Sequence, residues 1–257
     1  MSECSRRSIG GRESIESEIA GLNMNGRAAL WFALSIGLAS SGAAQPLPVA
    51  AESGTSAQAE AGPEEGSQLP AAANVLTNWV IATHDNGERP FMVIDKDAAE
   101  VFVFDAAGQS MGRAPVLVGA AKGDDSVPGV GDRELSNIPL KDRTTPAGRF
   151  IAKMGPASGH KRVLWVDYGA AISLHPVVTA NKKEHRLQRL NSATPDDNRI
   201  TFGCINVPTA FYQKVVAPLV KDDGGVVYIL PDTRPLKEVF AGVPFEEQAG
   251  QAIAIAQ

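Results

Sequence analysis

The chain has 257 residues and a formal net charge of −5, with 24 lysines and arginines against 29 aspartates and glutamates. Hydrophobic residues make up 44% of it, which excludes disorder throughout and suits one sizeable domain or two small ones. The acidic balance argues against nucleic acid as the main partner, because neutralising phosphates needs a cationic face. Two cysteines, Cys4 and Cys204, are too few for a disulfide framework or a cysteine-only zinc site.

An apolar run over residues 28–39 stands near the start of the chain. It is too short to cross a bilayer as a helix, which takes about 20 apolar residues. A charged segment beginning at Met24 precedes it, and small residues ending at Ala44 follow it. This pattern predicts that residues 1–44 are an over-extended start plus a secretory signal peptide, with membrane contact only before cleavage. An uncleaved membrane anchor is the alternative.

Cleavage after Ala44 removes Cys4 and leaves Cys204 as the single thiol of the mature protein. In an oxidising compartment, cysteines usually pair or are absent. A single thiol there is either a small buried apolar residue or a reactive group kept for chemistry. The count of cysteines does not separate these two interpretations.

Composition divides the rest of the chain into three parts. Residues 45–74 hold few large apolar side chains, which predicts a flexible linker. Regular runs of apolar residues begin at Val75. We expect one domain over 75–235, followed by a peripheral C-terminal extension over 236–257. The domain is expected to be mainly β, because short β-like runs fill it: Trp79–Thr83, Phe91–Asp95, Glu100–Phe104, Pro115–Gly119, Arg149–Lys153, Val163–Asp167, Ala171–Leu174 and Gly225–Leu230.

One helix and one long loop interrupt these runs. Pro208 suits the first turn of the helix, and Pro218 is expected to mark its end. Four apolar residues fall on one face of it: Phe211, Val215, Val216 and Leu219. The loop between Gly119 and Thr144 is rich in glycine, aspartate and proline, and loops of that length are often functional.

The segment 199–208, RITFGCINVP, holds the candidate nucleophile Cys204. Gly203 permits a tight turn, and the backbone N–H groups of Gly203 and Cys204 are candidates to face a developing oxyanion. A thiol becomes a useful nucleophile when a neighbour stabilises its thiolate, most often a histidine. His175, at the end of a predicted strand, is the candidate partner. The alternatives are a cysteine that serves as packing and a histidine that is satisfied at a strand end.

The other histidines are weaker candidates, because His84 and His160 lie in turn-like segments and His185 lies in a charged run. A zinc site made by His175, His185 and Cys204 is disfavoured, because no closely spaced pair of ligands is present. We therefore expect neither a metal nor an organic cofactor.

Three motifs, taken in chain order, resemble the catalytic domain of L,D-transpeptidases. They are TTPAGRF at 144–150, the strand-end His175, and TFGCIN at 201–206. The resemblance covers about residues 74–232 and implies a β-sandwich of mixed sheets with one or two short helices. Two departures stand out: Phe202 replaces the histidine that usually lies two residues before the cysteine, and a basic insertion at 181–199 lengthens the spacing.

The resemblance implies a periplasmic enzyme of peptidoglycan cross-linking. The Cys204 thiolate, activated by His175, would attack the carbonyl of the third residue of a tetrapeptide stem and form a thioester. An amine of a second stem would then resolve the thioester. Stem peptides are the expected partners. The resemblance implies that Thr201, Phe202 and Asn206 either hold the loop around Cys204 or contact the substrate.

The insertion at 181–199 is either an exposed charged loop or a lid whose Arg186 and Arg199 meet carboxylates of the stem. Three other functions stay open. Water as acceptor would make the protein an L,D-carboxypeptidase. The chain could also be a non-catalytic cell-wall-binding protein on the same fold, as Phe202 suggests, or a cysteine peptidase acting on proteins.

Overall fold

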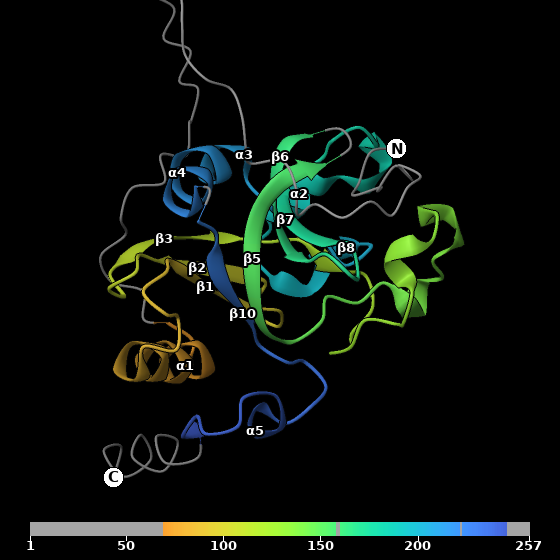
Figure 1. Ribbon diagram of the computed structural model, residues 1–257. Helices are drawn as coiled ribbons and strands as arrows, with labels where there is room; N and C mark the ends of the chain where they lie inside the picture. The colour runs from red at the N-terminus through yellow and green to blue at the C-terminus, as the bar shows by residue number, and fades with distance from the viewer. Residues whose placement is uncertain (1–68, 158–159, 222, 246–257) are drawn as a thin grey trace, which may run out of the picture. The chain divides into compact units, whose positions relative to one another are not determined.

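The computed structural model describes residues 69–157, 160–221 and 223–245 (Figure 1). Residues 1–68 and 246–257 lie outside the described residues. They include the expected signal peptide, most of the expected linker and the last part of the expected extension. Within the described ranges, no helix is long and apolar enough to cross a membrane.

The centre of the domain is an eight-stranded sheet of mixed pairing (Figure 1). β1 pairs in parallel with β10 and β7 with β9, whereas the other neighbours are antiparallel. The prediction of a mainly β domain with mixed sheets is therefore confirmed. Across the sheet the strands are β3 (Ser110–Pro115), β2 (Glu100–Phe104), β1 (Phe91–Asp95), β10 (Gly225–Ile229), β5 (Gly148–Ala157), β6 (His160–Asp167), β7 (Ile172–Pro176) and β9 (Ile205–Val207).

The sheet curls until its two ends approach each other. Leu117, just after β3, exchanges two backbone hydrogen bonds of 2.9 Å with Asn206 of β9. Beside this bridge, β4 (Val118–Gly119) and β8 (Arg199–Thr201) form a small parallel sheet. The curled sheet encloses a first hydrophobic core, to which strands of both halves contribute side chains such as Met92, Val227, Leu164 and Ile205.

A helix built of three segments closes this first core: α3 (Thr209–Phe211), a π-helical turn at Tyr212–Val216 and α4 (Ala217–Val220). Phe211 and Val216 are buried, as predicted, and so are Tyr212 and Val220. The prediction that Pro218 ends the helix is wrong. Pro218 lies in the first turn of α4, directly after the π-helical turn, where a residue without an N–H is tolerated.

The opposite face of the sheet carries a second core, covered by α1 (Ala71–Thr83) and α5 (Leu236–Val239) (Figure 1). The prediction of a strand at Trp79–Thr83 is wrong, because this run is the last part of α1. A short β-branched run cannot be told from the end of a helix by its pattern alone. Phe240 and Val243 are also buried in this core, so residues 236–245 are part of the domain rather than peripheral.

β3 and β4 differ from the strands that the sequence predicts. β3 is largely exposed and carries the polar sequence SMGRAP, so no apolar pattern marks it. The predicted strand Pro115–Gly119 is divided: Pro115 ends β3, Leu117 forms the bridge to Asn206, and Val118–Gly119 is β4. The predicted strands at Phe91–Asp95 and Glu100–Phe104 match β1 and β2, and the turn that begins at Asp105 closes the hairpin between β2 and β3.

A buried charge network ties the long loop to the sheet. The Lys96 Nζ donates to Asp124 Oδ1 at 2.7 Å and to the carbonyl of Thr145 at 2.9 Å. The Asp124 carboxylate also accepts from the backbone N–H groups of Asp232, Thr233 and Arg234. Burial alone would raise the pKa of Asp124, but these hydrogen bonds outweigh it and hold that pKa well below its usual range.

We predict that Asp124→Asn lowers the free energy of unfolding by about 3 kcal/mol at neutral pH, because the Lys96 ammonium loses its nearest carboxylate in a buried site. The pKa of Asp124 is lower in the folded than in the unfolded state, so its stabilisation is present above about pH 4 and is lost as the pH falls further. Urea unfolding should therefore show a difference from wild type that shrinks between pH 7 and pH 3.

The exposed Asp97, which pairs with Lys122, provides the control. Asp97→Asn should change the free energy of unfolding by less than about 1 kcal/mol. Equal effects of the two substitutions at pH 7, or a pH-independent effect of Asp124→Asn, would contradict the assignment.

Candidate active site

Cys204 lies in a tight turn between β8 and β9. The side chain of Thr201, the last residue of β8, forms two hydrogen bonds across this turn. The Thr201 hydroxyl donates to the carbonyl of Cys204 at 2.6 Å and accepts from the N–H of Gly203 at 3.1 Å. Gly203 has φ +123°, which favours glycine. The Gly203 N–H thus has a partner in the Thr201 hydroxyl, and its expected role toward an oxyanion stays a prediction. Thr201 therefore holds the backbone of this turn, which is one of the two roles expected for it.

The TTPAGRF motif contacts this turn directly. The Thr145 hydroxyl donates to the carbonyl of Gly203 at 2.8 Å and accepts from the N–H of Gly119 at 2.8 Å. A Cβ on Gly203 would lie 2.6 Å from the carbonyl oxygen of Thr144 and 2.6 Å from Ile172 Cδ1. The TTPAGRF and TFGCIN motifs, far apart in the sequence, are thus in direct contact. Because the backbone of Thr144 and the side chain of Ile172 come so close to Gly203, a residue with a Cβ would clash there.

The parallel pairing of β7 with β9 places the candidate base. His175 is opposite Asn206 in the register, and Cys204 immediately precedes β9. Because side chains alternate along a strand, His175 and Ser173 share the face away from the first core with Asn206 and Cys204. The Ser173 Oγ lies 3.8 Å from the Cys204 Sγ. The predicted pair therefore comes from adjacent strands and points to the same side.

His175 is fully buried, and both of its ring nitrogens have hydrogen-bond partners. Nδ1 lies 2.8 Å from the carbonyl oxygen of Pro176, and Nε2 lies 3.2 Å from Asn206 Nδ2. Nε2 is thus the ring nitrogen that faces β9. The role of His175 as a base toward Cys204 stays a prediction.

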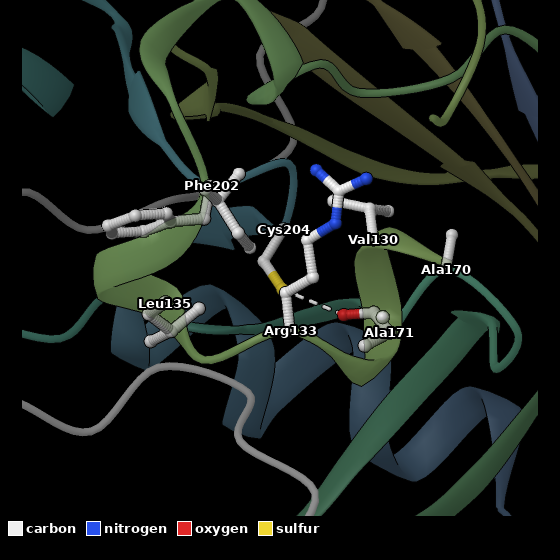
Figure 2. A pocket seen from close by; sticks show the side chains of 9 residues that line it. Val130, Arg133, Leu135, Ala170, Ala171, Phe202 and Cys204 are labelled. Atoms are coloured by element: carbon white, nitrogen blue, oxygen red, sulfur yellow. Dashed lines mark hydrogen bonds between the residues drawn. The ribbon is translucent and has the colours of Figure 1, made fainter. Parts of the chain in front are cut away.

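Cys204 lies in a pocket that the long loop builds over it (Figure 2). Its Sγ is directed at the carbonyl of Ala171, 3.5 Å away, and the residue is only 4% exposed. The walls are mostly apolar and come from the loop, from residues 170–171 and from Phe202; the loop contributes Val130, Gly131, Arg133, Leu135 and Ile138. In the part of the chain described, no three His, Cys, Asp or Glu side chains cluster in a way that could hold a metal ion.

One arginine of the loop lines this pocket and a second packs on its Phe202 wall, and neither was predicted from the sequence. Arg133 lines it and pairs with Asp142 at 3.0 Å. The Arg143 guanidinium lies 4.0 Å from the centre of the Phe202 ring, a cation–π contact. The residue that replaces the motif histidine is thus an aromatic wall of the pocket. The loop was marked as functional by its length, but nothing in its sequence singled out these arginines.

The two arginines that were expected to bind substrate lie elsewhere. Arg186 is 4% exposed and donates to Glu184 at 2.6 Å and to Asn206 Oδ1 at 2.8 Å. Arg199 lies 2.6 Å from a carboxylate oxygen of Asp232. Neither guanidinium lines the pocket, so their positions do not support direct contact with stem carboxylates. Asn206 is fully buried between Arg186 and His175 rather than at the pocket wall.

The chain is similar in structure to several solved proteins. The catalytic domain of the E. faecium L,D-transpeptidase matches with 14% identity and a TM-score of 0.34, over 55% of this chain and 97% of that chain. The helical cell shape determining protein Pgp2 from Campylobacter jejuni matches with 15% identity and a TM-score of 0.37, over 62% of this chain and 57% of that one. An L,D-transpeptidase from Xylanimonas cellulosilytica matches with 14% identity and a TM-score of 0.33, over 55% and 60%.

This chain therefore spans less than two thirds of the latter two proteins. The sequence matches no protein-family model. It also matches none of the curated proteins.

We predict that Thr145→Val lowers the free energy of unfolding by about 2 kcal/mol or more. Valine has the same shape, but it leaves the Gly203 carbonyl and the Gly119 N–H without the hydroxyl, and each unsatisfied buried group costs about 1–3 kcal/mol. Thr145→Ser keeps the hydroxyl and should cost about 1 kcal/mol, the value of one methyl group. Denaturant unfolding measures both, and a loss in the valine variant no larger than in the serine variant would contradict the role of the hydroxyl.

Proposed function

We propose that this protein is a periplasmic L,D-transpeptidase that acts on peptidoglycan stem peptides, with Cys204 as nucleophile and His175 as base. The observation that carries the proposal is the position of Cys204. Its thiol lies in a pocket, on a turn held by Thr145 and Thr201, and on the same face of adjacent strands as His175. Export by a signal peptide at 1–44, with a linker at 45–74, is part of the same proposal.

In the first step, the Asn206 amide gives up its contact with His175 Nε2, and the Cys204 thiol passes its proton to that nitrogen. The thiolate then attacks the carbonyl carbon of the third stem residue. A C–S bond forms and the carbonyl oxygen becomes an oxyanion, for which the Cys204 backbone N–H is the candidate donor. The C–N bond then breaks, and the terminal D-alanine leaves as an amine with the proton from His175. In the second step, the amine of another stem attacks the thioester carbonyl and gives its proton to His175. A C–N bond forms, the C–S bond breaks, and Cys204 leaves as the thiolate beside the protonated His175.

The side chains that line the pocket offer groups of the kind that the leaving D-alanine would need. This residue carries one methyl group and one carboxylate. Val130 and Ile138 provide apolar surface for the methyl group, and the Arg133 guanidinium provides a partner for the carboxylate. Arg133 already holds one carboxylate, that of Asp142, so a substrate carboxylate would compete with or share this pair.

Two other functions make different use of the same site. Water in place of the second stem gives an L,D-carboxypeptidase, with the same thioester on Cys204. A non-catalytic wall-binding protein would use Cys204 only as packing, and its 4% exposure is the observation that favours this alternative.

We predict that a carbapenem acylates the purified chain and that intact mass shows one adduct, mapped to the peptide that contains Cys204. The reason is that a β-lactam carbonyl can enter the pocket as the stem carbonyl would. Cys204→Ala should remove the adduct, and His175→Gln should slow its formation by about 10²–10⁴-fold, as expected for a lost general base. His84→Gln is the matched control, because His84 is exposed and lies beside the second core.

The absence of an adduct on folded wild type would reject the enzyme and favour the binding protein. Equal rates in His175→Gln and His84→Gln would reject His175 as the base.

A further inference from the structure

A buried serine lies beside the sulfur of Cys204, and the proposed mechanism gives it no role. Ser173 is fully buried on β7, and its Oγ lies 3.8 Å from the Cys204 Sγ, within reach of a hydrogen bond to sulfur. The register that sets Leu174 opposite Ile205 brings Ser173 level with Cys204, one residue earlier on each side. The pairing of β7 with β9 therefore builds this contact.

Another neighbour of the sulfur, the carbonyl of Ala171, favours the protonated thiol. The Cys204 S–H donates to this oxygen at 3.5 Å. A carbonyl only accepts, so it cannot bond to a thiolate, and its negative end lies beside the new charge once the proton has left. This contact therefore opposes ionisation of the thiol.

The fold holds the Ala171 carbonyl in place. Ala171 has φ +58°, which is uncommon for a residue other than glycine. Gly131 of the long loop packs closely on this turn, and a Cβ on it would lie 2.4 Å from the carbonyl oxygen of Gly169. Because the turn is constrained from both sides, its carbonyl is not free to rotate away from the sulfur. A thiolate at Cys204 thus needs a donor from another direction.

We propose that Ser173 is a catalytic residue that donates its hydroxyl hydrogen to the Cys204 sulfur and stabilises the thiolate. This inference rests on the proposed function, in which Cys204 is the nucleophile. A hydroxyl both donates and accepts, and its hydrogen rotates about the C–O bond, so Ser173 can bond to the thiol and then to the thiolate. Hydrogen bonds to an ionised partner are about twice as strong as neutral ones, so the contact strengthens as the proton leaves.

The burial of Ser173 supports this role, because a buried hydroxyl is unfavourable unless it is hydrogen-bonded, whereas alanine carries no such cost. Two charged or titratable side chains also bear on the sulfur. They are His175, two residues further along β7, and Arg133 in the pocket wall. Both would favour a thiolate through their positive charge, whereas Ser173 acts through a hydrogen bond. The test must therefore separate Ser173 from His175.

The test is a pH titration of the Cys204 thiolate in the folded chain, followed by its ultraviolet absorbance. Cys204→Ala is the blank and subtracts Cys4. Ser173→Ala should move the midpoint of ionisation up by about one pH unit or more, because the lost bond is to a charged group. Ser173→Thr keeps the hydroxyl, so its midpoint should lie closer to wild type than to Ser173→Ala.

Thr77→Val provides the matched control. Thr77 is a buried residue of α1, and within the described residues its hydroxyl has no hydrogen-bond partner. Valine keeps its shape, so this variant removes a buried hydroxyl that lies away from the sulfur. The midpoint of Cys204 ionisation should stay at the wild-type value.

A double variant shows whether Ser173 acts on the sulfur directly. In the His175→Gln background, Ser173→Ala should add a shift similar to the one it causes alone, because the hydrogen bond to sulfur does not pass through the imidazole. A shift that disappears in this background would assign the effect to the histidine and overturn the inference.

An unchanged midpoint in folded Ser173→Ala also overturns the inference, and so does an equal shift in Thr77→Val. If Ser173→Ala does not fold, Ser173→Thr and Ser173→Val are compared instead, since they share one shape, and equal midpoints overturn the inference. The titration does not depend on turnover. A chain that shows the Ser173 shift but forms no carbapenem adduct rejects the proposed function and leaves the bond from Ser173 to the sulfur standing.

Discussion

The parallel pairing of β7 with β9 is the constraint on which the site depends. It sets His175 opposite Asn206 and brings Cys204 to the same face, while Leu174 and Ile205 turn into the first core. A slip of one residue would exchange the two faces and bury the polar side chains in the core. The apolar packing of the alternate residues therefore holds the register, and the register determines which chemical groups meet.

A second set of contacts holds the cysteine turn against this strand pair. The buried Lys96 donates to the carbonyl of Thr145, and the hydroxyl of Thr145 donates to the carbonyl of Gly203. Cys204 follows Gly203 directly, so two hydrogen bonds connect the backbone beside the thiol to the buried charge network of Lys96 and Asp124. This buried network therefore helps to fix the backbone next to the candidate nucleophile Cys204.

The sequence predicted the elements whose signal is local. β1, β2 and β10 are continuous apolar runs, and the motifs around His175 and Cys204 were recognised from their residues. β8 and β9 are three residues each and exist only through their partners, so no run of residues marks them. Trp79–Thr83 was misread because helix α1 is defined by packing on the second core.

The positions of the arginines also could not be predicted from local sequence, because they depend on partners that are distant in the chain. Their residue type suggested carboxylate binding, and this is the chemistry they perform, but the partners differ from those expected. Arg186 and Arg199 meet carboxylates of the domain itself, while Arg133 lies at the pocket. Which arginine lies at the pocket depends on how the loop over residues 119–144 folds over Cys204, and long-range packing determines that.

The most direct test of acyl transfer by Cys204 is to incubate the purified chain with disaccharide-tetrapeptide and to separate the products by mass. The account predicts release of D-alanine and a dimer joined between the third residues of two stems, both abolished in Cys204→Ala. Release of D-alanine without a dimer would identify water as the acceptor. A tetrapeptide left intact by the folded wild-type protein would contradict the account.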